Sequence, residues 1–223
     1  MVTSLFLFYA ESKRDYIVEL NHTFLIQREG EAKMKEILMK YMTNLTTLSE
    51  EQQRMIVEEL QIEEYKKGTV LLRQGDVPSK CYFVLKGCIR QHCINESGKE
   101  VTSNFYTEEQ AISNFNHHKQ DKSSPHTLTC LEDCIVVVGE LNNEKGMYNK
   151  YSQLEEMTRQ MIEYNFGEIQ EELTLFIAST PEERYKSLLQ KRPHLIDRVP
   201  QYQLASYLGI TPESLSRIKK RLK

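Results

Sequence analysis

The end of the chain constrains the fold more than any other stretch. Residues 199–223 contain one apolar face at helical spacing, formed by Leu204, Ala205 and Leu208. Gly209 follows directly, at the position where a helix end favours a residue that tolerates positive φ. The pattern predicts a short helix that stops at a tight corner.

A second helix is predicted after the corner. Thr211 can cap it with its hydroxyl, and Pro212 lies in its first turn, where a missing N–H leaves no hydrogen bond unmade. Pro200 is expected to hold the same place in the preceding helix. Glu213 favours the positive end of the helix dipole. The small side chain of Ala205 would let the two helices approach closely.

The second helix has two chemically different faces. Its apolar stripe consists of Leu215, Ile218 and Leu222. A helix-turn-helix has this arrangement, and its second helix enters the major groove of DNA. Arginine can bind guanine O6 and N7, glutamate can accept a hydrogen bond from cytosine N4, and lysine can reach phosphate. An ordinary αα-hairpin at the end of a bundle is the alternative interpretation. The candidate DNA-binding residues are Thr211, Glu213, Ser214, Ser216, Arg217 and Lys220.

The charge of the chain is unevenly distributed. Its formal net charge is −3. Residues 181–223 have ten Lys or Arg against four Asp or Glu, a net charge of +6, so the rest of the chain carries −9. A basic C-terminal segment on an acidic body is typical of local contact with nucleic acid. We therefore expect double-stranded DNA to be bound by this segment and not along the whole chain.

The cysteines indicate a reducing compartment. There are five, an odd number with no CxxC pair: Cys81, Cys88, Cys93, Cys130 and Cys134. The apolar run at residues 5–8 is too short for a secretory signal and lacks a basic start. No apolar run approaches the length that spans a membrane. We expect a cytoplasmic protein without a membrane segment.

Four segments are predicted along the chain, and together they indicate an α+β fold. Residues 1–33 are an extension of open status, either an upstream start or a genuine N-terminal arm. Residues 34–142 are predicted to form an antiparallel β-roll or jelly roll, because short stretches rich in β-formers are separated by glycine turns. Residues 143–179 are expected to form a long dimerisation helix, and residues 180–223 a helical helix-turn-helix domain.

The segment 34–142 is also expected to begin with helices. Thr47 or Ser49 can start a capping box ahead of a short amphipathic helix. The apolar face of that helix is predicted to contain Met55, Ile56 and Leu60.

The long helix carries an apolar stripe that we expect to be buried against a second copy of the chain. The stripe slips once near residues 165–167, where we expect a bend or a break. A two-fold homodimer would place two recognition helices about 34 Å apart, one turn of the duplex. Thr180 is predicted to cap the next helix, which ends before Pro193. The stripe consists of Leu154, Met157, Met161, Tyr164, Phe166, Ile169, Leu173 and Phe176.

Several segments carry a family resemblance. Glycines stand at the β-roll turns Gly68, Gly75 and Gly87. Two stretches resemble strands of one protein family: Tyr82-Phe-Val-Leu-Lys-Gly-Cys-Ile-Arg and Leu131-Glu-Asp-Cys-Ile-Val. The most specific matches are Pro181-Glu-Glu-Arg-Tyr and Leu208-Gly-Ile-Thr-Pro-Glu-Ser-Leu-Ser-Arg-Ile. From about Met34 to Lys223 the chain thereby resembles the Crp/Fnr family of bacterial transcription regulators.

The resemblance implies a function. In the Fnr-like branch the recognition helix carries Glu, Ser and Arg at the places of Glu213, Ser216 and Arg217, which implies a TTG-like half-site. We therefore expect a homodimeric, sequence-specific transcription regulator that is not an enzyme. RNA polymerase and a small-molecule effector of unknown identity are further candidate partners.

One part of the family pattern is missing. Members that bind cyclic nucleotides carry a Gly-Glu pair and an Arg-Ser/Thr-Ala segment, and the corresponding regions here are residues 108–115 and 122–128. Ser124 stands roughly where the arginine would be. Without a cation, a buried phosphate would lack compensation. We expect no response to cyclic AMP and no cofactor, and we assign no effector-binding residue.

Three alternatives compete with this interpretation. Cys81, Cys88 and Cys93 could ligate an iron–sulfur cluster, but their strand-like surroundings favour simple packing. His117 and His118, near Asp121, suggest a cupin-like metalloenzyme. Adjacent residues of a strand point to opposite faces, so these histidines converge poorly and we expect no metal site. The third alternative is a dimeric adaptor whose helix-turn-helix does not bind DNA.

Overall fold

The computed structural model describes residues 32, 34–44, 46–112 and 123–222, so the predicted extension 1–33 lies almost wholly outside it. The described residues form two compact units. The first contains the residues up to Asn44 together with Leu48–Glu58. The second contains the linker before Leu48 and everything from Glu59 onward.

The described residues of the first unit form two helices. Residues 34–44 are helical, and α2 spans Glu50–Glu59. Ser49 caps α2: its hydroxyl accepts the Gln52 N–H at 3.3 Å, and its own N–H donates to Gln52 Oε1 at 3.0 Å. This is the reciprocal capping box predicted for Thr47 or Ser49, with Ser49 as the capping residue.

The buried face of α2 differs from the predicted one. The prediction that Met55 lies on this face is wrong, because its side chain is 53% exposed. The buried side chains lie at spacings of three and four, and each residue is rotated by about 100° from the one before it. Met55 is therefore turned away from the face, and Val57 takes its place. The buried residues of α2 are Gln53, Ile56 and Val57.

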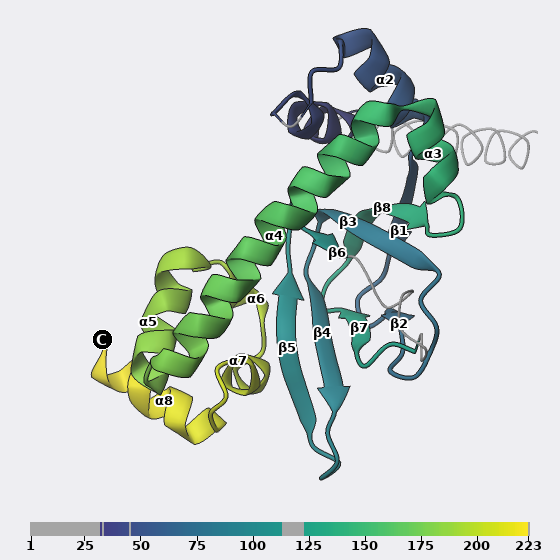
Figure 1. The fold of residues 1–223 in the computed structure, drawn as a ribbon. Coiled ribbons are helices and arrows are strands. Elements are labelled where there is room, and N and C mark those ends of the chain that lie inside the picture. The colour runs from purple at the N-terminus through teal and green to yellow at the C-terminus, as the bar shows by residue number, and fades with distance from the viewer. Residues whose placement is uncertain (1–31, 33, 45, 113–122, 223) are drawn as a thin grey trace, which may run out of the picture. The chain divides into compact units, whose positions relative to one another are not determined.

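The β-roll consists of two antiparallel four-stranded sheets (Figure 1). The first has the strand order β1-β8-β3-β6, and these strands span Gln61–Tyr65, Cys134–Glu140, Lys80–Lys86 and Ala111–Ile112. The second has the order β2-β7-β4-β5, and these strands span Val70–Leu72, Thr127–Cys130, Ile89–Ile94 and Glu100–Tyr106.

Alternating side chains from both sheets fill the interior of the roll. In β3 and β8 the buried residues face each other in register, with Val84 opposite Val136 and Tyr82 opposite Val138. Burying one face of each strand fixes the register, since a slip of one residue would expose the whole apolar set. The core cluster consists of Tyr82, Val84, Ile89, Ile112, Leu128, Cys130, Cys134, Val136 and Val138.

Gly87 closes the turn between β3 and β4, and no other residue fits there. Its φ is +108°, a conformation that side chains disfavour. A Cβ at this position would also lie 2.6 Å from Cys134 Sγ and 2.9 Å from the carbonyl oxygen of Asp133. The turn therefore packs its backbone directly against the start of β8.

The helical segment after the roll breaks earlier than predicted. Helix α3 spans Glu144–Lys150 and α4 spans Ser152–Ala178, with the interruption at Tyr151. There the Tyr151 hydroxyl donates to Glu59 Oε1 at 2.7 Å, which holds the break in place. Helix α4 runs through residues 165–167 without a break, so of the two expected forms the break is wrong, and the bend stays a prediction.

Four shorter helices end the chain. Helix α5, Pro181–Lys191, begins with the predicted cap: Thr180 Oγ1 accepts the Glu183 N–H, and the Glu183 carboxylate accepts the Thr180 N–H at 2.8 Å. It ends before Pro193, as predicted. Helix α6 was not anticipated. It is a single turn, Leu195–Arg198, followed by α7 (Gln201–Tyr207) and α8 (Pro212–Arg221).

The C-terminal helices share a hydrophobic core with the roll. Helix α7 contacts β5, and Figure 1 shows the two elements side by side. Phe105 of β5 and Cys88 are both fully buried, and they belong to the same cluster as Leu204 and Leu215. The α5–α8 segment is therefore packed directly on the sheet that contains β4 and β5.

Candidate nucleic-acid interface

The corner between α7 and α8 has the predicted geometry. Gly209 has a φ of +69°, and a Cβ there would lie 3.0 Å from the Phe176 ring. The Ile210 N–H closes the corner by donating to the Ala205 carbonyl oxygen at 2.9 Å. Thr211 caps α8, since its Oγ1 accepts the Ser214 N–H at 3.2 Å, and Pro212 occupies the first turn. Pro200 lies one position earlier than expected, as the N-cap of α7.

The apolar face shared by α7 and α8 is buried, except at Leu222. Leu204, Ala205 and Leu215 are fully buried, and Leu208 and Ile218 nearly so. These side chains pack with α5 and with the α6 region. The prediction that Leu222 continues the stripe is wrong: this residue is the C-cap of α8 and is 38% exposed.

The outer face of α8 carries the predicted DNA-binding residues. Thr211, Glu213, Ser216, Arg217 and Lys220 are exposed, and Ser214 is half-buried. They extend from the N-cap of α8 to its last turn. The structure brings the six side chains together without covering any of them completely.

Local hydrogen bonds organise this face. Arg217 Nη2 donates to Ser214 Oγ at 3.3 Å, and Ser214 Oγ lies 3.2 Å from Thr211 Oγ1. Hydrogen bonding to its own backbone, and then to Thr211, lowers the pKa of Glu213. Glu213 is therefore an ionised acceptor beside the Arg217 guanidinium, an arrangement suited to reading donors and acceptors on base edges.

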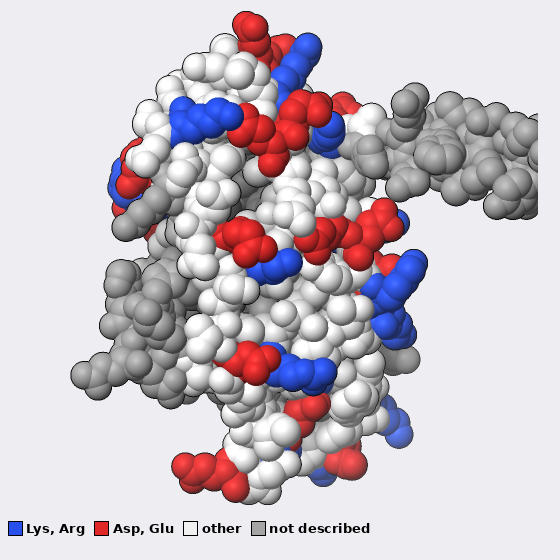
Figure 2. Space-filling view, turned by 90° about the vertical axis from the view of Figure 1, so that its right-hand side faces the viewer, with Lys and Arg blue, Asp and Glu red and all other residues white. Residues whose placement is uncertain are grey.

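Basic residues also gather at the end of α8. Its last turn contains Lys219, Lys220 and Arg221, which suit the negative end of the helix dipole. Arg221 is paired with Glu182 of α5 at 3.0 Å. On the face shown in Figure 2, by contrast, Lys and Arg alternate with Asp and Glu among the uncharged described residues. The charge on that face is mixed, which agrees with the expectation that contact with nucleic acid is local.

The second half of α4 has an uncovered apolar stripe. Phe166 is 60% exposed, and Ile169 and Leu173 are each 57% exposed. Ile177 is 76% exposed. The first half of the predicted stripe begins with Leu154, which is buried within the chain. None of the described helices is long and apolar enough to cross a membrane.

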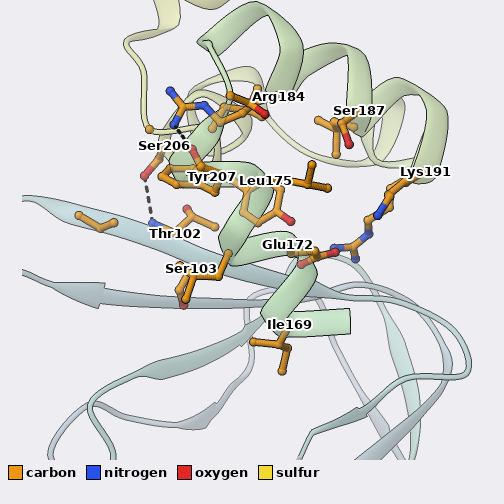
Figure 3. Close-up of a pocket in the computed structure, with 18 residues that line it drawn as sticks. Thr102, Ser103, Ile169, Glu172, Leu175, Arg184, Ser187, Lys191, Ser206 and Tyr207 are labelled. Atoms are coloured by element: carbon orange, nitrogen blue, oxygen red, sulfur yellow. Dashed lines mark hydrogen bonds between the residues drawn. The ribbon is translucent and has the colours of Figure 1, made fainter. Parts of the chain in front are cut away.

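A cavity of about 420 Å³ lies where this stripe meets α5, α7 and β5 (Figure 3). Ile169 and Leu175 line it from α4, and Thr102 and Ser206 line it from β5 and α7. Ser206 Oγ accepts the Thr102 N–H at 3.0 Å, so the floor of the cavity joins the roll to α7.

Two arginines attach the C-terminal helices to the roll, and no sequence pattern indicated either of them. Arg192 follows α5, and Arg198 ends α6. Arg198 pairs with Glu108 and with Glu132, which are 90 and 66 residues away in the chain. Sequence spacing cannot reveal pairs so distant, and only the packing of α6 on the roll identifies them.

The described part of the effector region contains a neutral site at the expected arginine position. Ser124 is buried, its hydroxyl donates to the His126 carbonyl oxygen at 2.8 Å, and its backbone pairs with Gly75 and Asp76. Residues 113–122, which hold much of this region, lie outside the described residues. The expectation of no cyclic AMP response stays a prediction.

The candidate metal ligands divide into two groups. Of the three candidate cluster ligands, Cys88 is buried, and Cys81 and Cys93 are half-buried. Burial raises the pKa of Cys88 to about 12. Among the described residues, no cluster of His, Cys, Asp and Glu is arranged to hold a metal ion. His117, His118 and Asp121 lie outside those residues, so the structure does not test the cupin interpretation at these positions.

Comparison with known proteins places this fold. Residues 62–151 match the family described as cyclic nucleotide-binding domain. The chain is similar to the structure of FixK2 from Bradyrhizobium japonicum, with 16% identity, a TM-score of 0.60, and coverage of 73% of this chain and 84% of that one. No curated protein matches the chain by sequence.

Two further structures have the same fold. The c-di-GMP responsive global regulator CLP of Xanthomonas campestris is 14% identical, with a TM-score of 0.59 and coverage of 76% of this chain and 89% of that one. A CooA mutant from Carboxydothermus hydrogenoformans is 12% identical, with a TM-score of 0.58 and coverage of 75% and 78%. At such identities the likeness shows the fold alone.

Proposed function

This chain contains a cyclic nucleotide-binding domain and has the fold of the Crp/Fnr transcription regulators, and on that premise we propose that it is a sequence-specific DNA-binding transcription regulator. Helix α8 is the recognition helix of a helix-turn-helix. No catalytic step belongs to this function.

One observation carries the proposal. The apolar face of α8 is used up in the core, with Leu215 fully buried, while Glu213, Ser216 and Arg217 project from the opposite side and are exposed. A helix whose polar face carries a guanidinium that donates two hydrogen bonds, a carboxylate that accepts them and a hydroxyl can distinguish base pairs in the major groove. An ordinary αα-hairpin would not need this set of groups on one free face.

The α4 stripe supports a homodimer. Burying a large apolar side chain contributes about 1.5–3 kcal/mol, and Phe166, Ile169, Leu173 and Ile177 have that contribution to gain. A parallel pair of α4 helices would bury the four residues from each copy. The resulting two-fold axis would present two α8 helices to the two halves of a palindrome.

The remaining parts of the proposal concern the effector, the partners besides DNA and the cellular location. Ser124, a neutral residue at the expected arginine position, supports a roll that does not respond to cyclic AMP. An effector of another chemical class, and RNA polymerase, are the partners that we propose besides DNA. Buried thiols such as Cys88 and Cys134 support a reducing, cytoplasmic location.

Binding to a palindrome with two TTG-like half-sites tests the function. Arg217→Ala should weaken binding by about 1–3 kcal/mol and relax the preference at one base pair of each half-site. Lys220→Ala should weaken binding evenly over all sequences and reduce the salt slope by about one. The matched control is Arg54→Ala, an exposed arginine in α2.

The same experiment separates the alternatives. An adaptor would show no affinity that falls steeply with salt. A sequence preference that Arg217→Ala leaves unchanged would contradict the assignment of α8 as the recognition helix. Metal found in stoichiometric amount with the purified protein would favour the cupin-like enzyme instead.

A further inference from the structure

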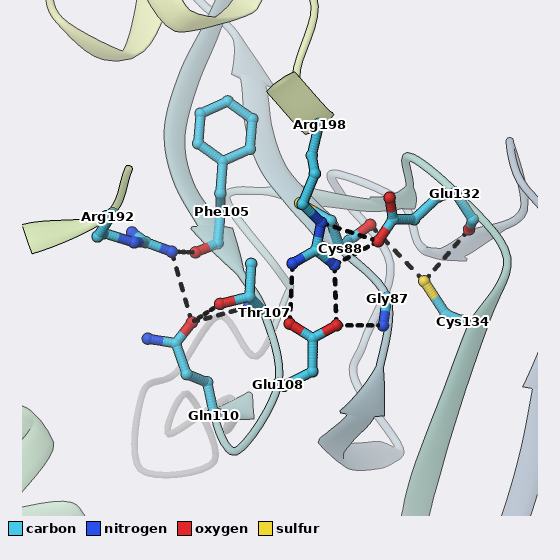
Figure 4. A network of polar contacts seen from close by, with 10 residues as sticks. All are labelled: Gly87, Cys88, Phe105, Thr107, Glu108, Gln110, Glu132, Cys134, Arg192 and Arg198. Carbon is cyan, nitrogen blue, oxygen red and sulfur yellow. Dashed lines mark hydrogen bonds and ion pairs between the residues drawn. The ribbon is translucent and has the colours of Figure 1, made fainter. Parts of the chain in front are cut away.

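Two carboxylates of the roll form ion pairs with one arginine of the C-terminal helices. Arg198 Nη1 and Nη2 each lie 2.9 Å from a carboxylate oxygen of Glu108, in the parallel two-bond arrangement (Figure 4). The Nε of the same guanidinium lies 3.2 Å from Glu132 Oε1, and Nη2 also donates to that oxygen. Glu108 belongs to the turn after β5, and Glu132 to the turn between β7 and β8.

Glu108 is itself fixed to the frame of the roll. Its Oε1 accepts the Gly87 N–H at 2.9 Å, at the turn where only glycine fits. Partial burial raises the pKa of Glu108, but the bonds from Arg198 and Gly87 outweigh burial and hold this pKa at about 2. The ion pair therefore persists over the whole physiological pH range.

A second arginine holds the neighbouring stretch of the roll. Arg192 Nη2 donates to the carbonyl oxygen of Phe105, and its guanidinium lies 3.4 Å from Asn104 Oδ1 and 3.5 Å from Gln110 Oε1. Gln110 Oε1 also accepts the Thr107 N–H at 2.8 Å. We call Arg192 and Arg198, with residues 104–110 and Glu132, the clamp.

A third attachment joins α7 to β5. Ser206 accepts the Thr102 N–H at 3.0 Å, and the Tyr207 ring packs edge-on against the Phe105 ring at 5.4 Å between centroids. These contacts attach α6, α7 and the end of α5 to the roll, and together they restrict rotation of the helices on it. The direction of α8 relative to the roll is therefore determined by these contacts.

We propose that Arg192 and Arg198 are positioning residues for DNA recognition, which fix the direction of α8 so that a dimer accepts only one spacing of half-sites. This inference rests on the proposed function. With the clamp closed, Glu213 and Arg217 stay exposed, so the clamp orients the recognition face and does not cover it. In this proposal neither arginine contacts DNA, and both act by fixing the direction of α8.

The position of the clamp also connects it to the effector region. Glu108 and Gln110 directly precede β6 and the segment that follows it. A ligand that displaced this turn would release Arg198 from one of its two carboxylates. A displacement of this turn in the roll would therefore change the contacts of Arg198 and, through them, the direction of α8.

Half-site spacing is the property that tests the proposal. One added base pair rotates the second half-site by about 35° around the duplex, since a turn has about 10 base pairs. Wild-type protein should bind one spacing best and lose about tenfold or more in affinity when the spacer changes by one base pair. Arg198→Gln should reduce that difference to about threefold or less while keeping the preferred half-site sequence.

Two further variants keep the test sound. Arg198→Lys retains a point charge without the two-bond fork and should give an intermediate spacing profile. Arg159→Gln is the matched control, because Arg159 also pairs with two carboxylates, Glu156 and Glu163, but within α4 alone. An unchanged profile in Arg198→Gln would overturn the proposal. A uniform gain in affinity at every spacing would also overturn it, because the clamp would then hold an inhibited arrangement.

Amide hydrogen exchange without DNA distinguishes failure of the clamp from failure of the proposed function. The Gly87 N–H is bonded to Glu108 of the clamp, and the Thr102 N–H is bonded to Ser206 of α7, so both amides should exchange faster in Arg198→Gln than in wild type. Unchanged exchange would mean that the clamp does not hold. If wild-type protein preferred no DNA sequence while this exchange did increase, the proposed function would fail and the attachment would stand.

Discussion

Helices α4 and α8 are both amphipathic, but they differ in what covers their apolar faces. In α8 the apolar residues are Leu215 and Ile218, and both are buried within the chain. In the second half of α4 the corresponding residues are Phe166, Ile169 and Leu173, and more than half of each side chain is exposed. The polar face of α8 is free, whereas in α4 it is the apolar face that is free.

Under the proposed function, this difference suits the two helices to different partners. A free face that combines Glu213, Ser216 and Arg217 suits a hydrogen-bonding partner such as the edges of base pairs. A free face of Phe, Ile and Leu suits an apolar partner, and a second α4 is the one that symmetry supplies. The same periodicity thus indicates a reading surface in one helix and an assembly surface in the other.

Truncating the covered face of α8 should have the largest effect. Leu215→Ala is expected to lower the free energy of unfolding by about 2–5 kcal/mol, because it leaves a cavity in a closed core. Leu222→Ala, at the exposed end of the same helix, should stay within about 0.5 kcal/mol of wild type. Urea denaturation measures both. Equal losses would mean that α8 is not anchored where the structure buries it.

Charging the open face of α4 should affect assembly and leave the fold intact. Leu173→Asp is expected to weaken dimerisation by about 1.5–3 kcal/mol or more for each copy, because the transfer of a leucine to the interface is lost and a charge opposes it. Met55→Asp places the same charge at an equally exposed site in α2 as a control. Sedimentation equilibrium compares them. If both variants associate as tightly as wild type, the exposed face of α4 is not the dimer interface.

Acid should loosen the cover of α8 through Glu108, with a smaller effect. The folded-state pKa of Glu108 is about 2 against an ordinary value of 4.5. Its contribution to stability is therefore complete above about pH 4.5 and is lost as the pH falls from there towards 2. Between about pH 6 and pH 3, wild type should lose more stability than Glu108→Gln, as urea midpoints would show. Parallel losses would place the acid sensitivity elsewhere.

Local signals predicted the helix ends because each depends on neighbouring residues only. The positive φ of Gly209 depends on that residue, and the Thr211 cap and the Thr180–Glu183 capping box are contacts between residues three positions apart. The antiparallel roll and the α+β fold were predicted for a similar reason, since strand alternation and glycine turns are short-range patterns.

Long-range packing explains what the sequence did not show. At the interruption between α3 and α4, Tyr151 bonds to Glu59, which is 92 residues earlier in the chain. Arg198 meets Glu108 only because α6 packs on the roll, and α6 itself is a single turn between Pro193 and Pro200. The α8 face was predicted as a set, but its freedom from the rest of the chain became visible only in the structure.

Selection of bound sequences from a random DNA pool tests the central claim most directly, since that claim is that the outer face of α8 reads base pairs. The account predicts enrichment of a palindrome whose two TTG-like halves are centred about one helical turn apart, and loss of the preference at one base pair of each half in Arg217→Ala. Enrichment of no sequence, or the same sequences with Arg217→Ala as with wild type, would contradict it.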